Sequence, residues 1–277
     1  MHKLARKVRF SISPFLTEDS PGYNSFASKP AGEGLSLFFE MNVELAGPVD
    51  AATGFVVNVA DIDSSVREYV VPIFSKRVRE EFGRGRHISF TDLAEILRQS
   101  WGQLADKFGA AKLARLSLAL NPFRKMTIEH QINREDCTMV HFTERFEFAA
   151  THKLWNAQFS EERNFEIFGK CANPTGHGHN YAVEVTVKRP LDKSDFSVSE
   201  FERIVFDELL IEVDHKNLNT DVAEFKRMNP TVENIAVFAW QKLAGKFGQG
   251  VLHCITVWET EKTYCSYYGK ERADERA

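Results

Sequence analysis

Hydrophobic and polar residues follow two different periods along the chain, and these periods predict strands and helices in the same order in both halves. Val183, Val185 and Val187 alternate with polar neighbours, which predicts a strand because side chains two residues apart point to one face of a sheet. From Ile235 to Leu243 the apolar residues recur at helical spacing, which predicts a helix. Each half is predicted to contain two strands, two helices and two further strands.

The predicted elements of the two halves correspond one to one. In the first half they span about Lys7–Ser13, Leu35–Leu45, Ile62–Val71, Phe90–Phe108, Leu113–Leu120 and Lys125–His130. In the second half they span about Val140–Thr151, His179–Lys188, Val198–Leu210, Thr231–Phe247, Val251–Glu259 and Thr263–Tyr268.

Short local matches indicate that the chain arose by duplication. Gly32-Glu33-Gly34-Leu35 stands where Gly176-His177-Gly178-His179 stands in the second half, and Lys107-Phe108-Gly109 matches Lys246-Phe247-Gly248. A repeat of roughly a hundred residues or more indicates duplicated domains rather than a solenoid. The polar segment Gln131–Cys137 is the predicted linker, so the expected domains are residues 1–133 and 138–270, followed by a charged tail at 271–277.

Composition and charge narrow the class of protein. The length of 277 residues favours two domains, and 43% hydrophobic with 27% charged residues is typical of a soluble globular protein. The net charge of -4, without a dense basic run, argues against a nucleic-acid partner. No apolar stretch approaches the ~18 residues of a membrane span, and no apolar signal-peptide core follows the basic N-terminus. The four cysteines form no C-x-x-C pair, so we expect free thiols and a cytoplasmic location.

The segment from Phe168 to Tyr181 carries the strongest chemical signal, because it places Cys171 six residues before a His-x-His pair. On an extended strand His177 and His179 point the same way and can bind one metal ion. His152, on the preceding predicted strand, is the best third ligand. Three histidines are a typical ligand set of catalytic zinc, with a fourth position left for water or substrate. A histidine taken alone is more often a hydrogen-bonded residue of the surface or core.

Three interpretations of Cys171 remain open on the residues alone. Free cysteines are usually small buried hydrophobes, and this suits Cys137, Cys254 and Cys265. Near a cation, however, the pKa of Cys171 would fall and its thiolate would be available as a base. The thiolate could also be a fourth zinc ligand in a closed structural site, but the presence of further acid–base candidates argues against that.

The further acid–base candidates are Asp214 and His215, and two other short motifs offer residues that could contact a ligand. In the pair Asp214-His215 the carboxylate can orient the imidazole for general acid–base work, although such pairs are common by chance. Glu259 ends an apolar strand, where a carboxylate is either solvated or accepts two parallel N–H bonds from a pterin or purine ring edge. Thr231 is a predicted N-cap that can also contact a ligand. Glu233 lies in the first turn of the same predicted helix, where the helix dipole favours an acidic residue, so it needs no functional role.

The first half keeps the apolar pattern but has different residues at every corresponding position, so it is predicted to be non-catalytic. The corresponding residues are Pro14 for His152, Ala27 for Cys171, Glu33 for His177, Leu35 for His179, Ser75 for Asp214, Lys76 for His215 and Leu120 for Glu259.

Taken in order, the second-half motifs resemble the 6-pyruvoyl-tetrahydropterin synthase family over residues from about 140 to 270. The motifs are Phe148-x-x-x-His152, the run from Cys171 to Tyr181, Asp214-His215-Lys216-Asn217-Leu218, Asn229-Pro-Thr-Val-Glu-Asn and Glu259-Thr260. The resemblance implies an α+β tunnelling fold, in which each ββααββ module has a four-stranded antiparallel sheet with two helices on one face. Two such tandem modules would assemble edge to edge into a barrel, which removes exposed sheet edges.

The resemblance also implies roles for the candidate residues. His152, His177 and His179 would bind Zn²⁺, Cys171 would be the base, and Glu259 would anchor the pterin ring, with Thr231 as a further substrate contact. Asp214 and His215 would relay protons. The implied enzyme is a carbon–oxygen lyase acting on phosphate in tetrahydrobiopterin biosynthesis. It would convert 7,8-dihydroneopterin triphosphate to 6-pyruvoyl-tetrahydropterin with elimination of triphosphate, and it needs no nicotinamide.

Other functions remain as alternatives. In the 6-carboxytetrahydropterin synthase of the queuosine pathway the thiol typically stands in C-x3-H-G-H, whereas here C-x5-H-G-H precedes Asn180-Tyr181 and resembles the pyruvoyl branch. Cys171 argues against an aldolase-like branch that often has a Glu near this position. A non-catalytic pterin-binding module is the third alternative. Because the first half cannot supply Asp214 and His215, we expect at most one active site per chain and a homo-oligomer, without nucleic-acid or membrane partners.

Overall fold

The structure is a computed structural model that describes residues 1–15, 35–129, 139–191, 196–248 and 250–269. Contacts divide the chain into two compact units, Met1–Phe142 with Arg189–Phe196 and Thr143–Lys188 with Ser197–Ala277. The predicted linker at Gln131–Cys137 and the predicted tail at 271–277 lie outside the described residues, as do Ala27 and the segment 32–34. The predicted domain boundaries therefore stay a prediction.

Unit 1 contains a four-stranded antiparallel sheet. Its neighbouring strands, in order, are β1 (His2–Ile12), β2 (Leu37–Gly47), β3 (Lys112–Ala119) and β4 (Arg124–Glu129). One row across the sheet joins Val8, Met41, Leu118 and Met126, and all four side chains are fully buried. This row lies on the face that carries the core, as the alternation of apolar residues predicts.

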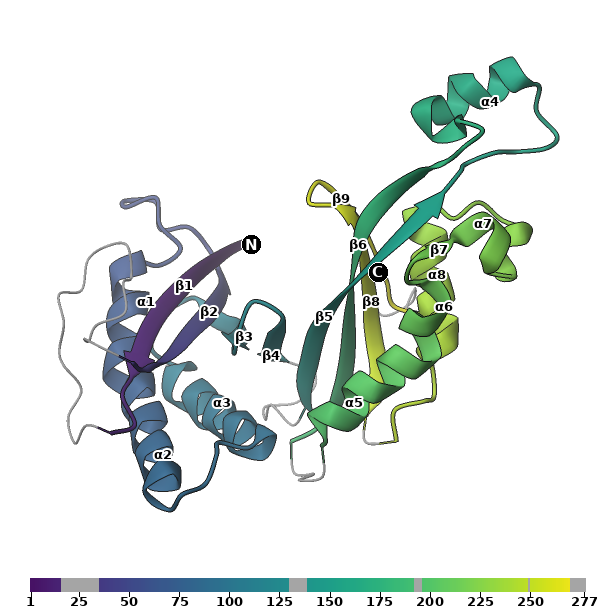
Figure 1. Ribbon diagram of the computed structural model, residues 1–277. Helices are drawn as coiled ribbons and strands as arrows, with labels where there is room; N and C mark the ends of the chain where they lie inside the picture. Colours follow the sequence, from purple (N-terminus) through teal and green to yellow (C-terminus); the bar gives the residue numbers. More distant parts are fainter. Residues whose placement is uncertain (16–34, 130–138, 192–195, 249, 270–277) are drawn as a thin grey trace. The chain divides into compact units, whose positions relative to one another are not determined.

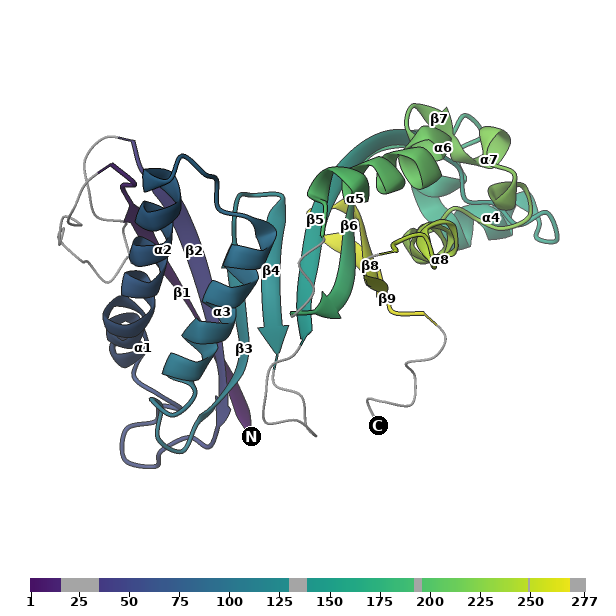
Figure 2. The same cartoon turned by 90° about the horizontal axis from the view of Figure 1, so that it is seen from below.

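The helices of unit 1 lie on one face of that sheet (Figures 1 and 2). The helical elements are α1 (Val59–Ser65), the π-helical turn η1 (Val66–Val70), α2 (Val71–Gly83) and α3 (Phe90–Leu104). The first three follow one another directly and bury Ile62, Val66, Val70, Phe74 and Val78, one residue in every four. This helical stretch is longer than the predicted Ile62–Val71, whereas α3 begins where expected, at a capping box between Ser89 and Asp92.

Unit 2 contains the strands that carry the candidate site residues. Its neighbouring strands are β5 (Met139–His152), β6 (His177–Pro190), β8 (Val251–Thr260) and β9 (Thr263–Tyr267), and the short β7 (Lys216–Asn217) runs parallel to β5. The start of β5, up to Phe142, and the end of β6, from Arg189, are assigned to unit 1. The pairs β6–β8 and β8–β9 are antiparallel. Val183 faces Val257 across β6 and β8, and both are fully buried.

The two expected helices of unit 2 cover one face of its sheet (Figures 1 and 2). The first is α5 (Val198–Val205), continued by the π-helical turn η3 (Phe206–Leu210) and α6 (Ile211–Val213), and the second is α8 (Val232–Leu243). Two short elements, α7 (Leu218–Asp221) and η4 (Glu224–Lys226), lie between them in the chain. The helix α8 ends four residues earlier than expected, because Ala244 is extended and Gly245 has a φ of +77°.

Besides the short α7 and η4, one longer helix was not expected from the sequence. The chain between β5 and β6 forms α4 (Glu161–Phe168) and the 3₁₀ turn η2 (Gly169–Ala172), which extend beyond the strand ends (Figure 1). The N-cap Ser160 accepts a hydrogen bond from the N–H of Arg163, and Glu161 and Glu162 occupy the first turn. The α+β class and the antiparallel sheet are confirmed, whereas tandem tunnelling modules and a barrel stay predictions.

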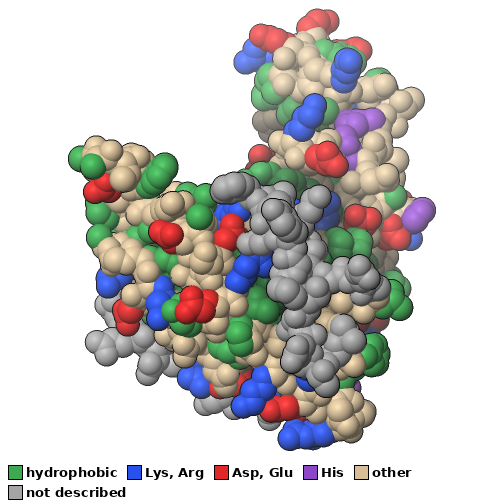
Figure 3. Space-filling model, turned by 90° about the vertical axis from the view of Figure 1, so that its left-hand side faces the viewer, with side chains coloured by type: hydrophobic (Ala, Val, Ile, Leu, Met, Phe, Trp, Pro, Cys, Tyr) green, Lys and Arg blue, Asp and Glu red, His purple; other side chains and the backbone are tan. Residues whose placement is uncertain are grey.

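No described helix has both the length and the apolar character needed to cross a membrane. On the face drawn in Figure 3, Lys and Arg side chains are interspersed with Asp and Glu.

Candidate metal centre

Three histidines meet at the adjoining ends of β5 and β6. His152 is the last residue of β5, and His177 and His179 stand at the start of β6. One ring nitrogen of each lies within 4.8 Å of the others, and the Nε2 atoms of His152 and His177 are 3.1 Å apart. These three residues are the set that the sequence predicted, and their arrangement could hold a metal ion.

Gly176 allows the two strand ends to approach each other. Its φ is +71°, and a Cβ atom at this position would lie 2.7 Å from the carbonyl oxygen of His152. A side chain would therefore clash with the backbone as well as strain the chain. The glycine before the His-x-His pair thus serves the close packing on which the three-histidine arrangement depends.

The surroundings of His152 fix its tautomer. Nδ1 lies 2.8 Å from the carbonyl oxygen of Pro230, and because a carbonyl only accepts, Nδ1 carries the proton and donates it. Nε2 is then left with its lone pair directed at His177. Burial lowers the pKa of His152, and burial likewise lowers the pKa of His179, so both rings favour the neutral form that binds metals.

One ring nitrogen at the cluster fits a metal ligand. Nε2 of His179, 3.6 Å from Glu259 Oε1, is buried and has no hydrogen-bond partner within the described ranges. Buried polar atoms are nearly always paired, so an orphaned nitrogen in a cluster of histidines is the signature expected of an ion site. The donor set, three imidazoles, suits zinc.

Glu259 lies against the histidines from the neighbouring strand β8. Its Oε1 is 3.5 Å from Nε2 of His152 and 3.6 Å from Nε2 of His179. Tyr181 faces the same cluster, because its hydroxyl is 3.3 Å from Nδ1 of His152 and its ring stacks on Phe148 with centroids 5.0 Å apart. Burial raises the pKa of Tyr181 far above its ordinary value, so the phenol stays protonated.

Cys171 lies beside the cluster on η2. Its Sγ is 3.8 Å from Nε2 of His177. Burial and then the carboxylate of Glu259 raise the pKa of the thiol above its ordinary value. In the protein alone the thiol is therefore protonated, and only a nearby cation would make the thiolate that the sequence-based interpretation requires.

Asp214 and His215 form a separate, rigid pair. Asp214 Oδ1 accepts a bond of 2.9 Å from the N–H of Ala149 and lies 3.0 Å from Nδ1 of His215. Burial alone would raise the pKa of Asp214, but these hydrogen bonds outweigh it and lower the pKa below its ordinary value. His215 has a φ of +56°, unusual for a residue other than glycine, and its N–H donates to the carbonyl of Ala149 at 2.6 Å. The His215 side chain is 82% exposed.

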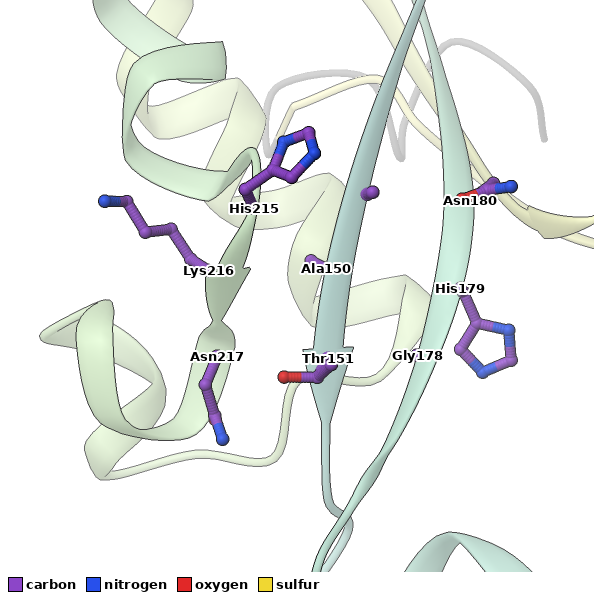
Figure 4. A pocket seen from close by; sticks show the side chains of 9 residues that line it. Ala150, Thr151, Gly178, His179, Asn180, His215, Lys216 and Asn217 are labelled. Carbon is purple, nitrogen blue, oxygen red and sulfur yellow. The ribbon is translucent and has the colours of Figure 1, made fainter.

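His215, but not Asp214, lines a pocket that His179 also lines. The pocket has a volume of about 430 Å³, and its lining residues are Ala149, Ala150, Thr151, Gly178, His179, Asn180, His215, Lys216 and Asn217. In Figure 4 the imidazole of His179 lies on the side of β6 away from His215. Among the residues that the structure describes, no hydrogen bond or ion pair joins Asp214 or His215 to Cys171. Of the predicted groups, direct contacts link the three histidines, Cys171 and Glu259, whereas Asp214 and His215 contact each other and Ala149, and His215 shares a pocket lining with His179.

Comparison with known proteins identifies the family of the second half. Residues 141–270 match the family model described as 6-pyruvoyl tetrahydropterin synthase. The human 6-pyruvoyl tetrahydrobiopterin synthase is 37% identical over 129 residues, which are 46% of this chain and 89% of the human protein. The chain belongs to the 6-pyruvoyl tetrahydropterin synthase family. The matched residues include every candidate site residue named above.

Relatives from other animals show the same range of similarity. The 6-pyruvoyl tetrahydrobiopterin synthase of Drosophila melanogaster is 37% identical over 131 residues, 46% of this chain and 78% of the fly protein. The solved 6-pyruvoyl tetrahydropterin synthase of Caenorhabditis elegans is 33% identical, covers 48% of this chain and 96% of its own, and superimposes with a TM-score of 0.45.

Thr231 is the N-cap of α8 and accepts a hydrogen bond from the N–H of Asn234 at 3.4 Å. Its contact with substrate stays a prediction.

Two features of the site, Tyr181 and the backbone carbonyl of Pro230, were not predicted from the sequence. Tyr181 continues the alternation of His177 and His179, so its place on the same face could have been read from the sequence. The role of the Pro230 carbonyl could not be predicted, because every residue has a backbone carbonyl and the sequence does not show which one accepts a hydrogen bond.

Proposed function

We propose that this protein is a zinc-dependent pterin synthase of tetrahydrobiopterin biosynthesis. It converts 7,8-dihydroneopterin triphosphate to 6-pyruvoyl-tetrahydropterin and releases triphosphate, the reaction of a carbon–oxygen lyase acting on phosphate. The observation that carries the proposal is the meeting of His152, His177 and His179 within 4.8 Å, beside a thiol and a carboxylate, in a member of this family. Several relatives bear the name of this synthase.

The three histidines would hold the ion, and each residue around them has a task in the reaction. Bound zinc would polarise the side-chain oxygens of the substrate and so acidify the neighbouring C–H bonds. Cys171, whose Sγ is 3.8 Å from His177, would take a proton from that side chain as its pKa falls near the cation. The C–O bond to triphosphate then breaks, and the hydrogens are redistributed within the product, so no external oxidant or reductant is required.

Glu259 would fix the orientation of the pterin ring. A carboxylate accepts two parallel N–H bonds from the guanidine-like edge of a pterin, and those bonds place the side chain of the substrate relative to the carboxylate. Oε1 of Glu259 lies 3.5 and 3.6 Å from His152 and His179, so a ring held there would present its substituent to the three histidines.

Asp214 and His215 would serve the site of another copy of the chain. In the described part of the chain neither residue is joined to Cys171 by a hydrogen bond or ion pair, and His215 lines a pocket and is 82% exposed. The corresponding residues of the first half, Ser75 and Lys76, cannot form such a proton relay. We therefore propose a homo-oligomer in which the second halves of the chains meet, with one active site per chain.

The direct test is an assay of products by mass. The wild type and Cys171→Ala would be incubated with zinc and 7,8-dihydroneopterin triphosphate, with Cys265→Ala on β9 as the matched control. We expect triphosphate and a pyruvoyl product from the wild type and from Cys265→Ala, and at least a hundredfold loss in Cys171→Ala, in line with the contribution of a general base. A carboxy product with acetaldehyde would assign the enzyme to the queuosine-type branch. Pterin binding without turnover would overturn the role of Cys171.

The same assay tests the role of His215. Cys171→Ala and His215→Ala should each be inactive alone, and activity should appear when the two are unfolded together and refolded as a mixture, because each then supplies the group that the other lacks. A mixture that stays inactive, while refolded wild type recovers, would contradict the sharing of the site between chains.

A further inference from the structure

The segment that follows His152 pairs with no strand among the described residues, and three asparagine side chains and one backbone carbonyl accept its N–H groups. Figure 1 shows the chain leaving the end of β5 and running toward α4. Its first four N–H groups all donate. Their acceptors are Asn219 Oδ1 for Lys153 at 2.7 Å, the carbonyl of Cys171 for Leu154 at 2.8 Å, Asn229 Oδ1 for Trp155 at 2.9 Å and Asn164 Oδ1 for Asn156 at 2.7 Å.

Two of these asparagines act as both acceptor and donor. Asn219 Nδ2 donates to the carbonyl of Lys153 at 2.9 Å, so its amide pairs with this residue as a strand would. Asn164 Nδ2 donates to the carbonyl of Asn156 at 3.0 Å, and the Asn164 side chain is fully buried. An asparagine amide has the donor and acceptor needed to replace a missing ladder partner.

Asn229 joins this segment to the partner of His152. Its neighbour Pro230 accepts the Nδ1 proton of His152, and Asn234 Nδ2 donates to the carbonyl of Asn229 at 2.8 Å. The orientation of the loop at 229–230 therefore determines both the direction of the imidazole and the course of the chain behind it.

The same segment is tied to the thiol. The bond from the N–H of Leu154 to the carbonyl of Cys171 connects the residue two positions after His152 with η2. A shift of the segment would therefore move His152 and Cys171 together relative to His177.

We propose that Asn164, Asn219 and Asn229 form an asparagine clamp that positions the metal ligand His152 and the thiol of Cys171. They are positioning residues, because each acts through the backbone of Lys153–Asn156. The inference rests on the proposed metal site for its significance in catalysis. Groups that orient a metal ligand typically change metal affinity by about 10- to 100-fold when they are removed.

The chemistry of the clamp predicts an asymmetric response to aspartate. Asn229 holds Trp155 through Oδ1, so Asn229→Asp keeps an acceptor and should bind metal nearly as the wild type does. Asn229→Leu has a similar size but no acceptor, and leaves the N–H of Trp155 unpaired. Asn219→Asp loses the Nδ2 donor and sets a carboxylate against the carbonyl of Lys153, so it should behave like Asn229→Leu.

The test measures zinc affinity by competition with a chromophoric chelator. We expect affinity to fall about 10- to 100-fold in Asn229→Leu and Asn219→Asp and to be retained in Asn229→Asp. The matched control is Asn121→Leu in unit 1, where Asn121 Oδ1 likewise accepts from the backbone N–H groups of Phe123 and Arg124, both at 2.8 Å. Its zinc affinity should not change. If Asn229→Leu does not fold, the comparison of Asn219→Asp with Asn229→Asp decides the question.

A second readout needs no metal. The rate of Cys171 alkylation in the metal-free protein, followed by peptide mass, should change in Asn229→Leu and stay close to wild type in Asn229→Asp. Wild-type affinity and alkylation in both Asn229→Leu and Asn219→Asp would overturn the clamp. If the wild type binds no zinc while the alkylation rates still separate Leu from Asp at this position, the clamp stands and the proposed metal site fails.

Discussion

Each side chain around the candidate centre has an environment that sets its protonation. His152 and His179 are kept neutral by burial, whereas burial and the carboxylate of Glu259 keep the thiol of Cys171 protonated. Neutral histidines are ready to bind a cation, and the thiol becomes a base when a cation arrives. The same small region therefore favours metal binding before proton removal.

A substitution of Glu259 tests this electrostatic arrangement. Because the Glu259 carboxylate raises the pKa of Cys171, Glu259→Gln removes one of its two causes and should lower that pKa. In the metal-free protein the pH profile of Cys171 alkylation should then shift to lower pH, and the rate at pH 8 should rise. Glu233→Gln, which changes an exposed carboxylate in the first turn of α8, is the control. A profile unchanged by Glu259→Gln would contradict the assigned cause.

The alternation of residues along the predicted strands indicated which histidines would lie close together. His177 and His179 were expected on one face of a strand, and His152 on its neighbour, because strand periodicity is regular. The orientation of His152 was not predictable, since it depends on the carbonyl of Pro230, which comes from a loop distant in the sequence. The position of Asp214 and His215 was not predictable either, because it depends on the pairing of β7 with β5. The strand β7 has two residues, too few for a periodic pattern in the sequence.

At the scale of elements, the site depends on how closely β6 begins beside the end of β5. Gly176 permits this contact, with a φ of +71° and with the carbonyl oxygen of His152 2.7 Å from where a Cβ would be. Gly245, after α8, has a φ of +77° and nothing within 4 Å of its Cβ position. The two glycines thus differ in the clash, not in the backbone conformation.

Gly176→Ala should therefore cost more than Gly245→Ala. In both variants the alanine is strained by the positive φ, which lowers the free energy of unfolding by about 1–3 kcal/mol. Only Gly176→Ala also displaces β5 from β6, so it should lose additional stability and bind zinc more weakly. Denaturant unfolding and a zinc titration measure both quantities. Equal losses of stability in the two variants, with zinc binding intact, would show that the close approach is not needed.

Most element types were predictable, while element ends and one helix were not. The helix predicted to end at Val71 continues to Gly83, and Phe74 and Val78 beyond Val71 keep the spacing of one buried residue in every four. The helix α4 was missed because its apolar side chains Phe165 and Ile167 are 40% and 45% exposed, so it lacks the buried stripe on which a periodicity search relies. Its N-cap and acidic first turn were the usable signal.

At the scale of the whole chain, both units have two strands, then helices, then two strands, although unit 2 has α4, η2, β7, α7 and η4 in addition. Among the described residues, the candidate centre lies in unit 2. Lys107 follows the end of α3 by the same three positions that separate Lys246 from the end of α8. This agreement supports the proposed duplication. The family match covers residues 141–270, and the first half has Pro14 and Leu35 where the second has His152 and His179. We therefore expect one metal site per chain, built from three histidines of the second half.

The zinc content of the purified chain tests that claim most directly. We expect about one zinc ion per chain for the wild type, because the described residues contain one three-histidine set. The ion should be lost in His177→Ala and retained in Cys171→Ser and in His215→Ala, since neither Cys171 nor His215 is a ligand. Zinc that persists in His177→Ala, or that disappears with Cys171→Ser, would contradict the three-histidine centre.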